Sequence, residues 1–157
     1  MSAHEVVFDP PIDGGIVVGH DGSASSDRAL AWGVREATLH GSALHVVRAW
    51  SLITAAALVK APFGVVPSFD ECAAAVRQET TRALQDTLAQ AGDPVLDAQV
   101  HVVHADPGDA LVAASRTAEV VIVGHRGHGG RLDAVLGSVA EHVLRHATSP
   151  VAVLRTR

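Results

Sequence analysis

Cysteine is almost missing from this sequence, since Cys72 is the only one among 157 residues. An internal disulfide bond is therefore impossible, and no cluster of cysteines can bind zinc. The sequence also lacks an apolar run of membrane-spanning length, and its N-terminus lacks the basic start and apolar stretch of a signal peptide. We therefore expect a cytoplasmic protein that has no membrane as a partner.

Positive charge is also scarce. The chain has 12 lysines and arginines against 17 aspartates and glutamates, and its formal net charge is −5. This balance gives no electrostatic reason to expect a nucleic acid as partner. With 48% hydrophobic and 18% charged residues, the composition is that of a globular protein. The length predicts one domain, which we place at residues 14–157 behind a leader of residues 1–13.

Apolar β-branched runs alternate along the chain with segments of helical spacing. We predict strands at 15–20, 43–50, 96–105, 119–124 and 150–156. We predict helices at 26–40, 70–92, 106–117 and from Ser138 onward, and a long connection at 51–69. Strands separated by helices cannot form hairpins, so we expect them to be parallel and covered on both faces. The predicted fold class is α/β, a doubly wound three-layer sandwich around a five-stranded parallel sheet.

Two polar loops follow predicted strands, "HDGS" at 20–23 and "GHRGHGGRLDAVLGS" at 124–138. In doubly wound folds, ligands bind beyond the carboxyl ends of the strands, where the winding direction reverses. If the strands before these loops are neighbours, the two loops face each other across one crevice.

The second loop has two interpretations. Its glycines, which are Gly124, Gly127, Gly129, Gly130 and Gly137, free the backbone to approach a phosphate, with Ser138 at a helix N-terminus and Arg126 and Arg131 adding charge. The same residues also suit a flexible turn before a capped helix. A Walker A loop is excluded because Lys60, the single lysine, is far from any glycine loop, and no G-x-G-x-x-G follows a strand.

The spacing of this loop identifies a further possibility. Gly124-x2-Gly127-x9-Gly137-Ser138 resembles the G-x2-G-x9-G-S/T motif of the ATP-binding branch of the universal stress protein family. "IVVGHDGSASSDRALAWGVREA", "GDALVAASRTAEVVIVGHRGHGG" and "LGSVAEHVLRHATSPVAVLR" resemble the same family. The resemblance implies an adenine nucleotide alpha hydrolase-like fold, ATP (with or without Mg²⁺) or another adenine nucleotide such as cyclic AMP as ligand, and a homodimer formed through the strand at 150–156.

The resemblance also implies site residues. Asp21 matches an acidic residue that contacts the adenosine, and Val46 matches a position that contacts adenine. The implied nucleotide-binding set is Gly19, His20, Asp21, Val46, Val123, Gly124, Arg126, Gly127, Gly137, Ser138 and Val139. His20 and His125 depart from the family pattern, and we expect both imidazoles to enlarge the pocket wall. For Asp21 the rival interpretation is an Asx turn in "DGS".

Metal binding and catalysis find little support. The histidine pairs His101/His104, His125/His128 and His142/His146 have ligand-like spacing, but the first pair, on a strand, should point to opposite faces. No G-x-S-x-G elbow is present, and the carboxylates near the glycine loop, Asp133 and Glu141, form no recognisable metal-binding motif. We predict no catalytic residue and no metal site.

The function that the sequence favours is that of a nucleotide-binding regulatory module in a stress response. A slow ATPase or phosphotransferase and a nucleotide-free interaction protein are the alternatives.

Overall fold

The structure, a computed structural model, describes residues 5–92, 97–127 and 135–156. Within them five parallel strands form one sheet in the order β3-β2-β1-β4-β5. The elements in chain order are β1 (Ile16–Gly19), α1 (Ala24–His40), β2 (Leu44–Trp50), α2 (Leu52–Ala56), α3 (Phe69–Ala91), β3 (Ala98–His104), α4 (Pro107–Ala114), β4 (Val120–Gly124), α5 (Ser138–His146) and β5 (Val151–Leu154). The predicted five-stranded parallel α/β sheet is confirmed.

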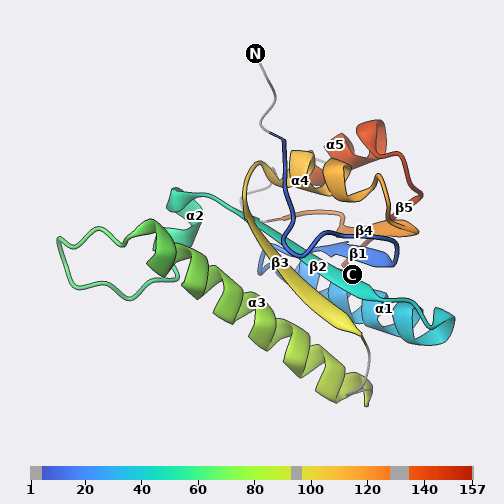
Figure 1. The fold of residues 1–157 in the computed structure, drawn as a ribbon, viewed down its shortest axis with the longest axis horizontal. Helices are drawn as coiled ribbons and strands as arrows, with labels where there is room; N and C mark the ends of the chain where they lie inside the picture. Colours follow the sequence, from blue (N-terminus) through green and yellow to red (C-terminus); the bar gives the residue numbers. More distant parts are fainter. Residues whose placement is uncertain (1–4, 93–96, 128–134, 157) are drawn as a thin grey trace.

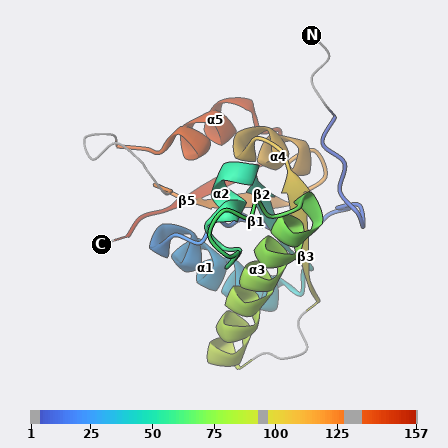
Figure 2. The same ribbon diagram turned by 90° about the vertical axis from the view of Figure 1, so that its left-hand side faces the viewer.

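Helices cover both faces of the sheet, as Figures 1 and 2 show, with α1 and α3 on one face and α4 and α5 on the other. Successive side chains of a strand point to opposite faces, so alternate residues of each strand pack against the helices on opposite sides of the sheet. On β1, Val18 packs with Leu30 of α1, whereas Val17 packs with Leu111 of α4. The sandwich therefore has two apolar cores, one on each side of a buried sheet.

Capping residues determine where the helices begin and end. Ser23 accepts a hydrogen bond from the Ser26 amide at 3.2 Å, so α1 begins at Ala24, two residues before the predicted start. Gly41 and Gly92, both with positive φ, end α1 and α3. No described helix is long and apolar enough to cross a membrane.

The connection between β2 and α3 is not wholly irregular, which corrects the prediction for residues 51–69. It contains α2, which begins with a reciprocal cap. The Ser51 amide donates to the Thr54 hydroxyl, and the Thr54 amide donates to the Ser51 hydroxyl. Beyond α2 the chain extends away from the sandwich (Figure 1, green). Large apolar side chains are exposed along residues 52–69, from the start of α2 to the first residue of α3, namely Leu52, Ile53, Phe63, Val65, Val66 and Phe69.

The described part of the predicted leader contributes to the core. Ile12 is buried in the cluster beneath α4 and α5, and Val6 and Phe8 pack against the same cluster. The Thr117 hydroxyl donates a hydrogen bond to the Ile12 carbonyl at 2.7 Å. Residues 6–12 therefore lie on the domain and cover part of one face of the sheet.

The winding direction reverses between β1 and β4. These strands are neighbours in the sheet, with Ile16 paired to Val120, although more than a hundred residues separate them in the sequence. From β1 the chain winds toward β2 and β3, whereas β5 lies on the other side of β4. The loops that follow Gly19 and Gly124 therefore lie side by side at the carboxyl edge of the sheet.

Candidate functional site

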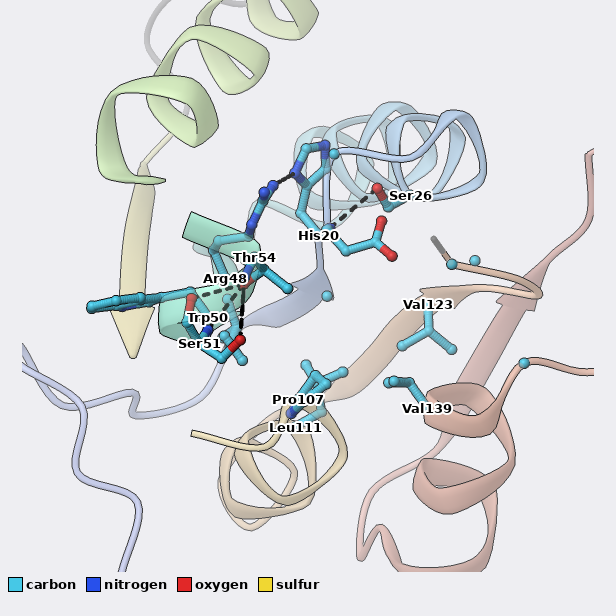
Figure 3. Close-up of a pocket in the computed structure, with 18 of the residues that line it drawn as sticks. His20, Ser26, Arg48, Trp50, Ser51, Thr54, Pro107, Leu111, Val123 and Val139 are labelled. Atoms are coloured by element: carbon cyan, nitrogen blue, oxygen red, sulfur yellow. Dashed lines mark hydrogen bonds between the residues drawn. The ribbon is translucent and has the colours of Figure 1, made fainter. Parts of the chain in front are cut away.

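A cavity of about 740 Å³ opens at this edge, between the two loops and the start of α5. Figure 3 shows Val123 and Val139 on one side, Ser51 and Thr54 on the other, and Leu111 at the base. The sequence-predicted residues that line it are Gly19, His20, Asp21, Val123, Gly124, Arg126, Gly127, Gly137, Ser138 and Val139. Residues from three distant parts of the chain thus meet in one cavity.

Val46 is the predicted site residue that the structure does not bring to this cavity. Its side chain is fully buried on the opposite face of the sheet, in the core cluster that contains Leu30 and Leu84. Its neighbour Val47 lines the cavity instead, and the Val47 carbonyl accepts a hydrogen bond from the His20 amide at 3.0 Å. Neighbouring residues of a strand point to opposite faces, so an offset of one residue places the side chain on the wrong face. The family resemblance therefore indicated Val46, whereas Val47 faces the cavity.

Asp21 occupies the cavity wall and also makes the Asx turn that was its rival interpretation. One carboxylate oxygen accepts a hydrogen bond from the Ser23 amide at 2.9 Å. The other oxygen lies against Gly127, where an added Cβ would collide with it. The turn therefore fixes the carboxylate in the wall between the two loops, so the two interpretations are compatible.

The start of α5 supplies the backbone groups expected of an anion site. Gly137 is the N-cap and offers no side chain, while Ser138, Val139 and Ala140 form the first turn and line the cavity. First-turn amides have no partner within their helix, and they carry its partial positive charge. The Gly137 amide differs, because it donates to the His125 carbonyl at 2.6 Å and so ties the loop end to β4.

Part of the glycine loop lies outside the described residues. Gly129, Gly130, Arg131, Asp133 and His128, all considered from the sequence, belong to this part. The described residues of the loop, 124–127 and 135–137, still include the first two glycines of the spacing motif and the last one.

The two unusual histidines do not enlarge the pocket as expected. The His20 side chain is only 1% exposed, because its ring lies between Asp27 and Arg48. His125 turns away from the cavity, and its Nδ1 atom lies 3.3 Å from the Ser25 hydroxyl and accepts a hydrogen bond from the Thr156 amide at 3.3 Å. Both imidazoles therefore organise the chain around the cavity.

Several cavity residues were not found from the sequence. Arg48 and Glu79, an ion pair at 2.8 Å, border the cavity together with Trp50, Ser51 and Thr54. The available signal was an arginine in the middle of the apolar run "LHVVRAW", because a charge in a buried strand requires a partner. Its partner on α3 could not be identified from sequence spacing.

The histidines in the described part of the chain do not assemble a metal site. No group of three histidine, cysteine, aspartate or glutamate residues is arranged to hold a metal ion within the part of the chain that the structure describes. His101 and His104 point to opposite faces of β3, since His101 contacts Phe8 and His104 contacts Trp50. His142 and His146 stack at 4.5 Å on α5.

Comparisons with known proteins agree with this architecture. Residues 15–155 match the sequence model of the universal stress protein family. A universal stress protein of Mycobacterium tuberculosis is 35% identical over 157 residues, which covers 99% of this chain and 50% of the relative. Another, of Mycolicibacterium smegmatis, is 31% identical over 145 residues, covering 89% and 47%. The chain thus spans about half the length of the curated relatives it matches.

Solved structures give the same result. A universal stress protein in complex with cAMP is 26% identical, with a TM-score of 0.66 and coverage of 93% of this chain and 98% of that chain. A universal stress protein of Archaeoglobus fulgidus in complex with dAMP shares the fold, with 22% identity, a TM-score of 0.57 and coverage of 91% and 98%. The sheet order, the matched residues and these similarities lead to one conclusion: the chain belongs to the universal stress protein family.

Proposed function

We propose that the chain binds an adenine nucleotide in the cavity at the switch point and acts as a regulatory module in a stress response. The observation that carries this proposal is the convergence of the β1 loop, the β4 loop and the first turn of α5 on one cavity of about 740 Å³. Ligand cavities commonly measure about 300–1,000 Å³ and combine apolar walls with a few polar groups. The solved relative in complex with cAMP supports adenine as the base.

The lining residues fit the parts of a nucleotide. Apolar side chains of Val47, Leu111, Val123 and Val139 offer surface to a base and ribose, and Asp21 can accept hydrogen bonds from ribose hydroxyls. The first turn of α5 and the Arg126 side chain suit phosphate oxygens. ATP is the ligand we favour, with Mg²⁺ accompanying its phosphates, and cAMP is the alternative ligand.

We infer binding without rapid hydrolysis from Glu141, the carboxylate near the phosphate end that lies within the described residues. Fast phosphoryl transfer needs carboxylates that hold the metal and a group that orients the attacking water. Glu141, on α5, pairs with Arg145 at 2.8 Å and does not line the cavity. We therefore expect phosphate release with Mg²⁺ to stay near the buffer rate. ATP hydrolysis by the wild type at about 1 per second or more would instead favour an ATPase, provided that the Gly127→Val variant loses this activity.

Calorimetry with ATP, ADP, AMP and cAMP tests the binding proposal. The wild-type protein should bind at least one of them, and Asp21→Ala should weaken binding by about tenfold through a lost charge-assisted hydrogen bond. Gly137→Val should weaken it as well, because a branched side chain would stand where phosphate approaches. Asp70→Ala, an exposed carboxylate on α3, is the matched control and should change nothing. A folded wild-type protein that gives no heat with any of the four contradicts the proposal.

We further propose that the protein is a cytoplasmic homodimer joined through β5, without nucleic acid or membrane as partner. The order of the strands leaves β5 with a neighbour on one side only, and Val151–Leu154 carries no charge. An uncharged edge strand invites pairing with another strand. Two-fold symmetry would pair the two copies of β5 antiparallel to each other.

A further inference from the structure

Four polar side chains form a continuous chain beside the cavity. Asp27 of α1 lies 2.7 Å from His20 Nε2, His20 Nδ1 lies 3.4 Å from Arg48 Nη1, and Arg48 Nη2 donates to Glu79 of α3 at 2.8 Å. Figure 3 shows the contact between Arg48 and His20 at the cavity. This polar chain links α1, the β1 loop, β2 and α3 in a region where His20 and Arg48 are almost fully buried.

The partners of His20 define the protonation that this arrangement needs. The Asp27 carboxylate can only accept, so His20 Nε2 must carry the proton and donate. The Arg48 guanidinium can only donate, so His20 Nδ1 must present its lone pair. The polar chain therefore requires neutral His20, with the proton on Nε2.

His20 is also the residue directly before Asp21. Its amide is bonded to the Val47 carbonyl, and the Arg48 guanidinium lies beneath Gly22, where an added Cβ would be 3.3 Å from Nη1. Arg48 therefore lies next to both residues that flank Asp21, His20 and Gly22.

We propose that His20 is a positioning residue that makes ligand affinity in this cavity depend on pH. A second proton on His20 would bind at Nδ1 and place an N–H and a positive charge against the Arg48 guanidinium. The two cations repel, the β1 loop moves, and Asp21 loses its place in the wall. This inference rests on the proposed nucleotide binding, which it extends with a proton as regulator.

Other charges around His20 act in both directions. Asp27 on α1 and Glu79 on α3 favour the protonated ring, while Arg48 on β2 opposes it. Arg82 and Asp86 of α3 share a groove with His20, and Asp21 belongs to its own loop. The contact that differs between the two protonation states is the one to Arg48, since only there does an acceptor become a donor.

Calorimetric titration with cAMP at a series of pH values from about pH 8 to about pH 5 tests the proposal, because a phosphodiester keeps one negative charge throughout this range. The wild-type affinity should fall by about tenfold at the lower pH, the value of one hydrogen bond to a charged group. The comparison variant is His20→Gln, whose amide can donate and accept but does not titrate. Its affinity should change with pH by less than about twofold.

A second variant, Asp27→Asn, tests the direction of the effect at a partly exposed position. The asparagine keeps an acceptor for His20 but removes the negative charge that favours the protonated ring. The pH at which affinity falls should therefore move to lower values than in the wild type. Circular dichroism at both pH values establishes that each variant is folded.

The outcomes separate the two proposals. Absence of binding of ATP, ADP, AMP and cAMP at pH 8 by the folded wild type overturns nucleotide binding and this inference with it. Wild-type binding that is equal at both pH values, or a fall that persists unchanged in His20→Gln, overturns the inference alone. An unchanged midpoint in Asp27→Asn also overturns it.

Discussion

At the scale of single residues, Gly124 at the end of β4 and Gly127 in the next loop lie closer to their neighbours than any side chain allows. A Cβ atom at Gly124 would lie 2.8 Å from the Ser25 carbonyl carbon and still closer to its hydroxyl. A Cβ atom at Gly127 would meet the Asp21 carboxylate. The cavity wall therefore depends on close contact of the end of β4 and the loop after it with the β1 loop and the first turn of α1, which are far apart in the sequence.

Gly124→Ala should destabilise the protein by about 1–3 kcal/mol, because backbone atoms must move to admit the methyl group. Gly137→Ala is the matched control in the same loop, since its methyl group would lie 3.3 Å from Arg126 Cα and needs only a small shift. Urea denaturation followed by circular dichroism measures both free energies of unfolding. Equal values for the two variants would refute the close approach at Gly124.

Two buried histidines on β2 and β3 give the fold its own pH dependence. His45 Nδ1 lies 2.9 Å from His101 Nε2. Burial lowers the pKa of His101 to about 4, with the positive charges of His45 and Arg77 adding to the effect, and burial also lowers the pKa of His45. The unfolded chain therefore binds more protons than the folded chain between about pH 4 and pH 6.5.

Stability should consequently be complete above about pH 6.5 and should fall as the pH drops toward 4, by on the order of 2 kcal/mol. His101→Gln should reduce this slope, because the buried titrating ring is gone. His40→Gln, at an exposed position near the end of α1, should keep it. Urea midpoints measured from pH 7.5 to about pH 4 decide the matter, and identical slopes for the two variants would exclude the histidine pair as the cause.

At the scale of elements, α3 begins with a reciprocal cap. The Ser68 hydroxyl accepts from the Glu71 amide at 3.2 Å, and the Glu71 carboxylate accepts from the Ser68 amide at 2.7 Å. This second hydrogen bond lowers the pKa of Glu71. The cap ends the exposed apolar segment after α2 and fixes where α3 starts.

Ser68→Ala should therefore destabilise the protein by about 1 kcal/mol, since an orphan amide of α3 loses its partner. Ser149→Ala, at a half-buried serine outside any helix cap, is the control and should have little effect. The free energy of unfolding in urea is the readout. A loss in Ser149→Ala as large as that in Ser68→Ala would show that the cap is not responsible.

The order and type of the long elements could be predicted because each one is specified by local signals. The helical spacing of Leu30, Val34 and Ala37 placed α1, and all three side chains are fully buried. Gly92 marked the end of α3. The short helix α2 was missed because its only signal, Ser51 with Thr54, stands in a stretch whose prolines and glycine favour irregular structure.

The sequence predicted the two loops of the candidate site but not the residues of β2 and α3 that border the cavity. The spacing of Gly124, Gly127 and Gly137 located the cavity because the motif lies within one stretch of chain. The contact between His20 and Arg48 joins two strands and is supported by a third element, so no local pattern reveals it. For Val46 the resemblance identified the strand but not the face of the sheet on which its side chain lies.

At the scale of the whole molecule, the open edge of β5 carries the prediction of a homodimer. Sedimentation at micromolar concentration should give twice the chain mass, and Val153→Asp should shift the protein toward monomer by placing charge on the edge strand. Leu39→Asp, at an exposed apolar residue on α1, is the control and should remain dimeric. Thermal melting verifies that both variants are folded, and a wild-type monomer would refute the prediction.

The central position of β1 has a consequence for synthesis of the chain. β1 is made first, yet one of its two neighbours, β4, begins at Val120. A nascent chain can pair β1 with β2, and β2 with β3, but the other edge of β1 stays open until β4 has left the ribosome. The cavity includes residues as late as Ala140, so its lining is complete only after the first turn of α5 has been synthesised. A ligand in this cavity would therefore bind chains that contain α5 in preference to chains that end before it.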